Sequence, residues 1–454
     1  MTDLRFGVQL PSLLTPPPGP ASRELASELA RYESPNVTYL SEEFPVFWAE
    51  AAGANVRDVD GNVYVDLTAA FAVAGAGHAN ARVVAAIREQ AGRLLHGMGD
   101  VHPPDVKVAL LRTLAEIAPG GLRRSILASS GAEAVEAALK TVRMATGKSR
   151  VLAFHGSYHG LTLGALAVSG REDFRERFSS QLGPGAVFAP YAYAYRSAFG
   201  EDPDGMKALE YVEYLLDTPG TATEDVGAIL VEPVQGRGGD VVPPPAWLPG
   251  LRRICDERGL LLVLDEVYTG FGRTGRWFAC EHWGVVPDLL VVGKALTGGF
   301  PFAACIGTDE VMSAWPASSG EAIHTSTFLG NPVGCAAALA SIEELRERGL
   351  VERSARLGAR LQEQLREEIG EHPKVGEIRG LGMMIGVELV RDRATREPGP
   401  ELAGRVVVEA LRRGVLLLGG GIHGNVLSLS PPFVITEEQM EAAIGVVREC
   451  VFSL

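Results

Sequence analysis

Short apolar runs alternate with stretches of helical spacing through the middle of this chain. Two of the runs, Leu260–Leu264 and Leu289–Val292, have the length and the branched aliphatic content of strands that are buried on both faces. Further strands are predicted over Ile126–Ser129, Val151–Phe154 and Ala228–Glu232, and helices over Ala132–Thr146 and near Leu248–Arg258. Because strands and helices alternate, the pattern predicts an α/β fold with a doubly wound, mainly parallel sheet.

The two ends of the chain follow other patterns. A helix over Ser22–Tyr32, capped by Ser22, precedes strands that fold around the turn Asp60-Gly61-Asn62. The last part combines helices with strands over Met383–Leu389, Val415–Leu418 and Val426–Leu429. This mixture predicts a second, smaller α+β domain, in keeping with a chain of 454 residues that is too long for one ordinary core.

Charged groups end both central strands. Asp265-Glu266 follows the first of them and Lys294 follows the second. Since parallel sheets bind ligands beyond the carboxyl ends of their strands, we expect a carboxylate and an amine to meet at one crevice. A lysine can form a Schiff base with a carbonyl, and pyridoxal phosphate is held in this way with an acidic partner on its ring nitrogen. The alternative is that Lys294 is a surface lysine at a strand end.

A glycine pattern in the same stretch points to another cofactor. Gly270, Gly272 and Gly275 spell G-x-G-x-x-G directly after a strand, as in dinucleotide-binding proteins. That motif should open a helix and be followed by an acidic residue at the end of the next strand. Here Asp288 begins the next strand instead. We therefore interpret the glycines as a loop that crosses the site.

Composition excludes several classes of protein. The net charge of −14 argues against nucleic acid or an anionic membrane as the main partner. No apolar run approaches the roughly 18 residues of a membrane span, and the N-terminus lacks the cationic start and apolar core of a signal peptide. The five cysteines are scattered and form no C-x-x-C pair, which favours free thiols in a cytoplasmic protein. No metal site is predicted.

The motifs DEVYTGFGRTG and DLLVVGKALTGGFP identify a family that the chain resembles. They are similar to those of the class III pyridoxal-phosphate-dependent aminotransferases, which include ornithine and 4-aminobutyrate aminotransferases. The resemblance extends from about Phe47 to the end of the chain. It implies a fold-type I transferase with a large cofactor-binding domain (71–335), a small C-terminal domain (336–454) and an N-terminal segment (1–70) that packs with the small domain.

The resemblance also implies which residues hold pyridoxal 5'-phosphate. Ser130, Gly131 and Ala132 match the segment that binds the phosphate, and a strand that ends where a helix begins is in any case an anion site. An ordinary N-cap at Ser130 is compatible with that role. The remaining implied contacts are Tyr158 and Val267 on the two faces of the ring, Asp265 on its nitrogen, Glu232 near that carboxylate, Lys294 as Schiff-base lysine, and Thr327 on the phosphate of a neighbouring subunit.

Thr327 therefore implies a homodimer or a higher oligomer, unless it is a plain loop hydroxyl. Taken alone, Tyr158 is more often a core or rim aromatic, and His159 is expected to be structural. The common substrate clamps of the family are missing or moved, since arginine after Y-H-G is replaced by Leu161 and glutamine after D-E-V by Tyr268.

A second clamp pair is replaced as well. Many family members have a glutamate at one position and its arginine partner at another, and this chain has Arg237 and Ser428 at these two positions. An arginine without an acidic partner can bind a carboxylate through two parallel hydrogen bonds. We hypothesise that Arg237 anchors the substrate carboxylate. The alternative is that it points to solvent or pairs with Asp240.

The function implied by the resemblance is amino transfer from an amino acid or amine to a keto acid by a ping-pong mechanism, with Lys294 as proton carrier and Asp265 as its catalytic partner. A racemase or epimerase of the same family is the first alternative, because the same proton can return to the other face of the carbon. A non-catalytic protein that binds the cofactor is the second. No residue of the sequence decides between amino transfer and racemisation, and the substrates are not predicted beyond small molecules.

Overall fold

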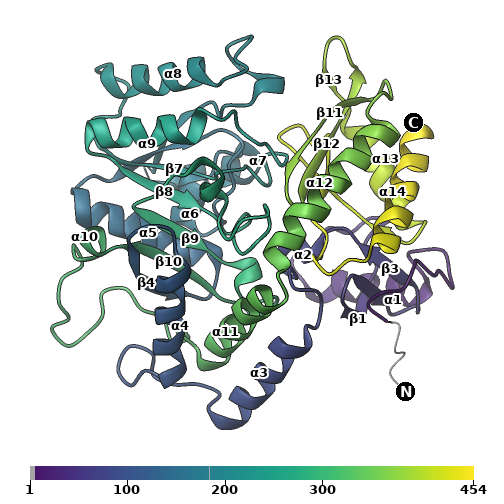
Figure 1. Cartoon of the computed structure of the whole chain (residues 1–454), viewed down its shortest axis with the longest axis horizontal. Coiled ribbons are helices and arrows are strands. Elements are labelled where there is room, and N and C mark those ends of the chain that lie inside the picture. Colours follow the sequence, from purple (N-terminus) through teal and green to yellow (C-terminus); the bar gives the residue numbers. More distant parts are fainter. Residues whose placement is uncertain (1–5, 184) are drawn as a thin grey trace.

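A seven-stranded sheet forms the centre of the larger part of the molecule (Figure 1). The computed structural model describes residues 6–183 and 185–454, so the first five residues of the segment considered for a signal peptide lie outside it. The strand order is β4-β10-β9-β8-β7-β5-β6. The bounds are β4 (Leu122–Ala128), β5 (Arg150–Phe154), β6 (Ala186–Ala189), β7 (Val226–Val231), β8 (Leu261–Asp265), β9 (Leu289–Val292) and β10 (Ala303–Thr308). Only β10 runs antiparallel to its neighbours among these strands, so the predicted mainly parallel sheet is confirmed.

Helices cover both faces of this sheet. Consecutive residues of β8 point to opposite faces, as in any strand. Val263 belongs to the same buried cluster as residues of α5 (Gly131–Thr146), whereas Leu262 and Leu264 belong to the cluster that contains residues of α9 (Trp247–Arg258). The central strands are therefore apolar throughout because each of their faces is buried under helices, which is the arrangement of a doubly wound α/β fold.

The smaller part contains two further sheets. One has the order β1 (Trp48–Ala52), β2 (Asn55–Asp58), β3 (Val63–Asp66) and β14 (Val415–Leu416), and the other has the order β11 (Val375–Leu381), β12 (Met384–Asp392), β16 (Val426–Leu429) and β15 (Leu418–Gly420), with β13 (Glu397–Pro398) beside β12. The prediction of one strand over Val415–Leu418 is wrong. The chain leaves β3 after Leu416 and pairs with β16 from Leu418, so the run is divided between the two sheets.

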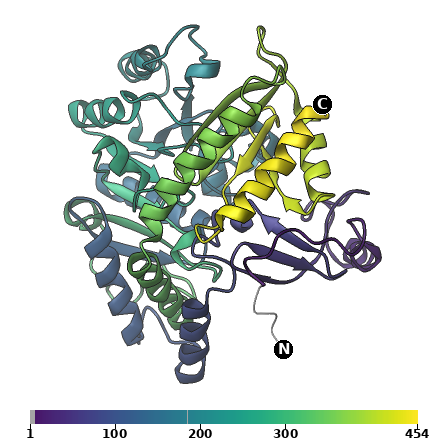
Figure 2. The same cartoon turned by 45° about the vertical axis from the view of Figure 1, so that its right-hand side comes forward.

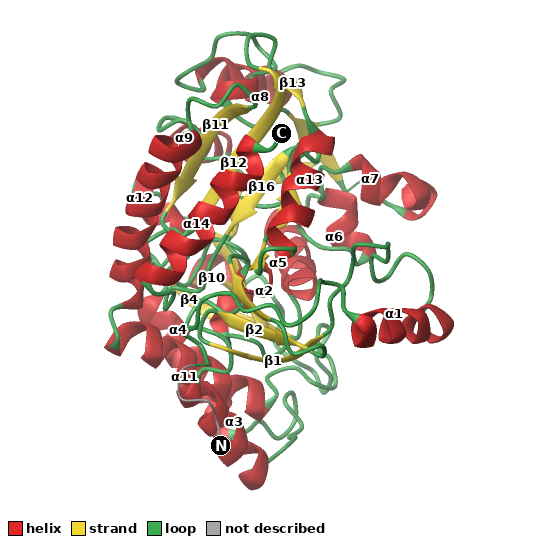
Figure 3. Cartoon of the chain, turned by 90° about the vertical axis from the view of Figure 1, so that its right-hand side faces the viewer, coloured by secondary structure: helices red, strands yellow, loops and turns green. Residues whose placement is uncertain are grey.

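N-terminal and C-terminal segments lie together in the smaller part. Parallel pairing of β14 with β3 joins them, and Figure 2 shows the N-terminal strands beside the C-terminal helices. The helices α12 (Leu350–Ile369), α13 (Pro400–Leu411) and α14 (Glu437–Phe452) pack side by side over the sheet of β11, β12 and β16 (Figure 3). The division of the chain at residues 70 and 335 stays a prediction.

The remaining helices lie elsewhere along the chain. They are α1 (Pro20–Tyr32), α2 (Ala69–Ala72), α3 (Ala81–Arg93), α4 (Asp105–Ile117), α6 (Leu163–Val168), α7 (Glu172–Arg175), α8 (Met206–Asp217), α10 (Asp309–Met312) and α11 (Pro332–Glu347). Within the described ranges, no helix has both the length and the apolar content that crossing a bilayer requires. The five cysteines are all unpaired and buried.

The N-terminal helix is capped by a residue outside it, so the prediction of a cap by Ser22 is wrong. The helix begins at Pro20, a position where the missing N–H of proline costs nothing. The carboxylate of Asp60 accepts hydrogen bonds from the backbone N–H groups of Ala21 (2.8 Å) and Ser22 (3.0 Å) and from the Ser22 hydroxyl (2.7 Å). The predicted turn at Asp60 thus supplies the cap that satisfies the first turn of α1.

Candidate active site

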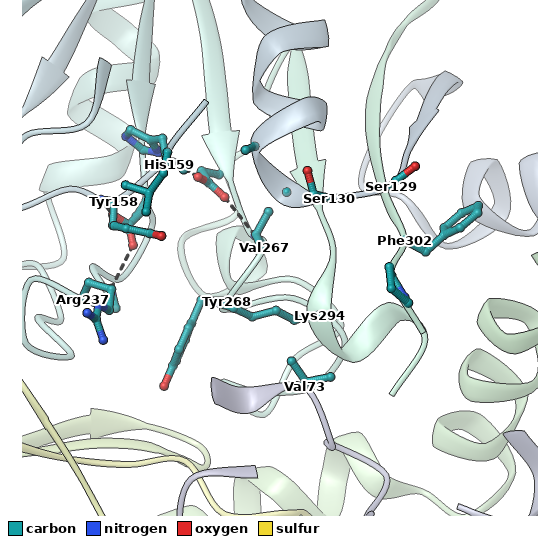
Figure 4. A pocket seen from close by; sticks show the side chains of 18 of the residues that line it. Val73, Ser129, Ser130, Tyr158, His159, Arg237, Val267, Tyr268, Lys294 and Phe302 are labelled. Atoms are coloured by element: carbon teal, nitrogen blue, oxygen red, sulfur yellow. Dashed lines mark hydrogen bonds and ion pairs between the residues drawn. The ribbon is translucent and has the colours of Figure 1, made fainter. Parts of the chain in front are cut away.

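A pocket of about 410 Å³ opens beyond the carboxyl ends of β8 and β9, where the sequence predicts a crevice (Figure 4). All of the predicted site residues except Thr327 and Ser428 line it: Ser130, Gly131, Ala132, Tyr158, Leu161, Glu232, Arg237, Asp265, Val267, Tyr268 and Lys294. The volume is in the range of pockets that enclose small molecules. The structure therefore brings together side chains from five separate loops at one place.

Lys294 stands directly after β9 in a backbone conformation that few residues adopt. Its φ of +46° lies in the left-handed region, which is uncommon for a residue with a Cβ and is often found at functional sites. The side chain reaches into the pocket beside Tyr268, with Nζ 4.1 Å from the centre of the Tyr268 ring (Figure 4). Burial lowers the pKa of the Lys294 amine to about 8, against the opposing charges of Asp265 and Glu232.

Asp265 ends β8 and is held through both of its oxygens. Oδ2 lies 2.7 Å from Nδ1 of His159, and Oδ1 accepts a hydrogen bond of 3.0 Å from the backbone N–H of Val267. The carboxylate is only 5% exposed, so its orientation is fixed by these partners. The expectation that His159 is structural overlooked this contact, since 106 positions separate the two residues and no local pattern joins them.

Glu232 holds two loops at the wall of the pocket. Its carboxylate accepts hydrogen bonds of 2.9 Å from the backbone N–H groups of Tyr158 and Gly236. Burial raises the pKa of Glu232 to about 7, and the nearby charge of Asp265 acts in the same direction. The residue lies near Asp265, as the resemblance implies, and it also positions the backbone that carries Tyr158.

The N-terminus of α5 forms the opposite corner of the pocket. Ser130 is its N-cap and accepts a hydrogen bond of 3.2 Å from the backbone N–H of Glu133, so the ordinary capping role is present. The first N–H groups of a helix have no backbone partner within it, and Gly131 and Ala132 of this first turn line the pocket. Gly131 packs so closely on Val267 that a Cβ at position 131 would lie 3.1 Å from Cγ1 of Val267.

These residues fit pyridoxal phosphate. The N-terminus of α5, the oriented carboxylate of Asp265 and the amine of Lys294 all line this one pocket. Tyr158 and Val267 offer an aromatic ring and a branched aliphatic side chain to a flat ring. The N-terminus of α5 suits a phosphate, the Asp265 carboxylate suits a protonated ring nitrogen, and the Lys294 amine suits an aldehyde.

Arg237 lies at the edge of the pocket and is half-buried. Its guanidinium carbon is 5.8 Å from the centre of the Tyr158 ring, and it forms no ion pair with any carboxylate of the described residues. The alternative that Arg237 pairs with Asp240 is wrong, because Asp240 is fully buried and makes no contact of that kind. The backbone of Arg237 is fixed, since its carbonyl accepts hydrogen bonds from Arg171 Nη1 (3.0 Å) and from the backbone N–H of Gly421 (3.2 Å).

Two predicted residues lie elsewhere. Ser428 is a half-buried residue of β16 that pairs with Gly386 of β12, and it does not line the pocket. Thr327 is exposed in the loop before α11, outside the pocket of its own chain. Their expected roles stay predictions.

Sequence reasoning missed several lining residues. Val73 lines the pocket and directly follows the segment Ala69–Ala72. The four residues of that segment all have left-handed φ values, between 44° and 64°. Nothing in the small residues of this stretch predicted that geometry. Phe300 and Phe302 line the same pocket after the Thr297-Gly298-Gly299 turn. These residues add apolar side chains to the lining of the pocket.

The chain is similar to known proteins over nearly its whole length. The model of the family described as aminotransferase class-III matches residues 38–451. An alanine/serine racemase of Pyrococcus horikoshii is 34% identical over 98% of this chain and 93% of its own length, and a 5-aminovalerate aminotransferase of Pseudomonas aeruginosa is 38% identical over 89% and 93%. The solved structure of an amine transaminase from an uncultivated Pseudomonas species in its PLP-bound form is similar with a TM-score of 0.86, 31% identity, and coverage of 93% of this chain and 98% of that one.

Proposed function

Because this chain belongs to the class III aminotransferase family, we propose that Lys294 is the residue to which its cofactor, pyridoxal phosphate, is attached and the group that carries the proton during amino transfer. One observation supports this proposal above the others. The Lys294 amine is the only lysine amine of the described residues that lines the pocket, and the buried carboxylate of Asp265 lines the same pocket and acts on its charge. The cofactor supplies an electron sink for the substrate carbon, and the protein supplies binding, orientation and proton transfer.

Each neighbour has a distinct part in this proposal. Asp265, oriented by His159, binds the ring nitrogen and keeps it protonated. The first turn of α5 binds the phosphate, and Tyr158 and Val267 hold the ring between them. The freed amine of Lys294, with its pKa lowered to about 8, can take a proton near neutral pH and return it at a neighbouring atom.

The substrate would be a small molecule with a carboxylate, bound by Arg237. The support is a guanidinium at the pocket edge that no carboxylate of the described residues neutralises, on a backbone fixed from two sides. Leu161 and Tyr268 line the rest of the pocket and favour a neutral or apolar side chain over a second carboxylate. A role for Ser428 would be indirect, since it does not line the pocket itself.

Racemisation is the second candidate function, because one of the relatives with the highest coverage is an alanine/serine racemase. Both reactions begin with removal of the same proton, and they differ in where it returns. Exchange of the amino group with added keto acids supports amino transfer. Loss of optical activity of an amino acid without any keto acid would favour racemisation instead.

Replacing Lys294 by alanine tests the proposal directly. Lys294→Ala should abolish turnover and the visible absorption of the lysine-bound cofactor, while some cofactor stays bound through the phosphate and ring contacts. Lys140→Ala is the matched control, since Lys140 is an exposed residue of α5. Wild-type turnover in the Lys294 variant would contradict the proposed role.

We also propose a homodimer in which Thr327 reaches the phosphate bound by the partner subunit. Around Thr327, two loops expose apolar side chains. The loops are joined by the contact of His96 with Phe328 (ring centres 5.5 Å apart) and by a hydrogen bond between Thr325 and Asp100 (3.1 Å). The exposed apolar side chains are Leu95, Met98, Val101, Ile323 and Phe328. A surface of this kind favours a second copy of the chain. A fully active monomer in sedimentation experiments would contradict the dimer.

The unpaired, buried cysteines support a cytoplasmic location, where thiols stay reduced. Fractionation of cells that express the protein tests this part of the proposal, and recovery outside the cytoplasmic fraction would contradict it.

A further inference from the structure

Tyr268 presents the face of its ring, and not its hydroxyl, to the reacting amine. The Lys294 Nζ atom lies 4.1 Å from the ring centre. The hydroxyl is engaged elsewhere, since it donates a hydrogen bond of 3.1 Å to the Ser430 hydroxyl. In the described part of the chain, the Lys294 amine forms no hydrogen bond and no ion pair, so the ring is its direct partner.

The ring is fixed at its two ends. At the inner end, Gly236 packs against it so closely that a Cβ at position 236 would lie 3.2 Å from Cγ of Tyr268. At the outer end, Ser430 accepts the hydrogen bond from the phenol and donates one of 3.0 Å to the carbonyl of Thr68. A ring constrained in this way keeps its face toward the amine without any contribution from the substrate.

A cation held over an aromatic face is stabilised by the charge distribution of the ring, and the stabilisation is stronger when the cation is removed from water. Other charged groups also act on this amine. Asp265 and Glu232 favour its charged form, and Arg237 and Arg273 disfavour it. Neither Asp265 nor Glu232 forms an ion pair with Nζ, whereas the centre of the Tyr268 ring lies 4.1 Å from it.

We propose that Tyr268 is a positioning residue that binds the Lys294 amine as an ammonium ion whenever that amine is free. Lys294 must release the cofactor when a substrate amine arrives and must return to it when the product leaves. Between these events the face of the Tyr268 ring holds the protonated amine in one position. The proton that the amine carries therefore stays inside the pocket. This inference rests on the proposed role of Lys294 and adds a contact with that lysine to the place of Tyr268 in the pocket lining.

The test measures protonation of the amine directly. The full chain loaded with pyridoxamine phosphate, in which Lys294 is free, is labelled with acetic anhydride over a series of pH values, and the peptide that carries Lys294 is quantified by mass spectrometry. Tyr268→Leu should lower the pKa of the Lys294 amine by about one unit, a tenfold change in its protonation equilibrium. Tyr268→Phe, which keeps the ring and loses the hydroxyl, should titrate as the wild type does.

Two controls make the result specific. The exposed Lys140, labelled in the same samples, should titrate identically in all variants. Ser430→Ala should behave as Tyr268→Phe does, and Tyr268→Gln should show the shift of Tyr268→Leu, which keeps the test open if the leucine variant fails to fold. An unchanged Lys294 titration in both ring-less variants would overturn the inference, as would an equal shift in Tyr268→Phe. Either result leaves the outcome of Lys294→Ala unaffected, so the two proposals can fail separately.

Discussion

The Nδ1 atom of His159 lies 2.7 Å from Oδ2 of Asp265, which joins the loop after β5 to the end of β8. The other oxygen of Asp265 accepts the backbone N–H of Val267, so one partner fixes each oxygen. A carboxylate oxygen can accept a second hydrogen bond, and those of Asp265 lie at the pocket wall. The pair thus gives the carboxylate one orientation before any ligand binds.

Replacing His159 should weaken catalysis through Asp265. In His159→Leu the buried Oδ2 loses its partner, and we expect kcat/KM to fall roughly 10- to 100-fold, as for a lost hydrogen bond to a charged group of about 1.5–3 kcal/mol. His155→Leu is the matched control, because His155 is an exposed residue of the same loop and stacks on Phe188. Equal kinetics for the two variants would show that His159 does not act on Asp265.

The close packing of Gly131 on Val267 should make the pocket corner at the N-terminus of α5 sensitive to one added methyl group. In Gly131→Ala the new Cβ would meet Val267 at 3.1 Å. Val267 must then move, and its side chain is the one proposed to hold the cofactor ring. We expect overpacking of about 1–2 kcal/mol, and hence roughly 5- to 30-fold weaker binding of pyridoxal phosphate by equilibrium dialysis. Gly445→Ala, where a Cβ meets nothing within 4 Å, should bind the cofactor as the wild type does.

The lowered pKa of Lys294 should appear in the stability of the cofactor-free protein. The folded value of about 8 lies below the ordinary 10.5, so between these values the unfolded chain binds one more proton, and the free energy of unfolding rises with pH. Lys294→Met has no amine at this position and lacks this pH dependence. We expect the variant to have a higher free energy of unfolding than the wild type, by an amount that is constant below about pH 8. Above pH 8 this difference should shrink by at most about 3 kcal/mol, and by less if water enters the pocket. Urea unfolding at fixed protein concentration measures this, and parallel pH curves would contradict it.

The central sheet and several residues that line its pocket were predictable because their signals are local. A strand buried on both faces must be apolar along its length, so Leu289–Val292 could be assigned from its composition. Lys294 and Asp265 could be placed together because the ends of parallel strands share one edge. The junction of β4 with α5 is likewise visible in Ser130 and Gly131.

Contacts between distant segments were not predictable in this way. The contact between His159 and Asp265 depends on the order of β5, β7 and β8 in the sheet, which the sequence does not state. The cap of α1 comes from Asp60, since a carboxylate that accepts three hydrogen bonds competes well with the local cap at Ser22. The run Val415–Leu418 is divided because tertiary pairing with β3 and β16 outweighs its local strand preference.

Arg237 should determine which substrates the enzyme accepts. Its guanidinium lies at the pocket edge beside Tyr158 with no ion-pair partner among the described residues, and its carbonyl is bound by Arg171 and Gly421, so it can bind a carboxylate without first breaking a contact. In Arg237→Gln, KM for amino donors with a carboxylate should rise roughly 10- to 100-fold, which corresponds to a lost charged hydrogen bond of about 1.5–3 kcal/mol. Simple amines should be nearly unaffected, because they offer nothing for the guanidinium to bind. Arg177→Gln removes the same charge from an exposed position outside the pocket and should leave both classes of donor unchanged. If KM rises equally for carboxylate-bearing donors and simple amines in Arg237→Gln, the residue shapes the pocket without anchoring the carboxylate.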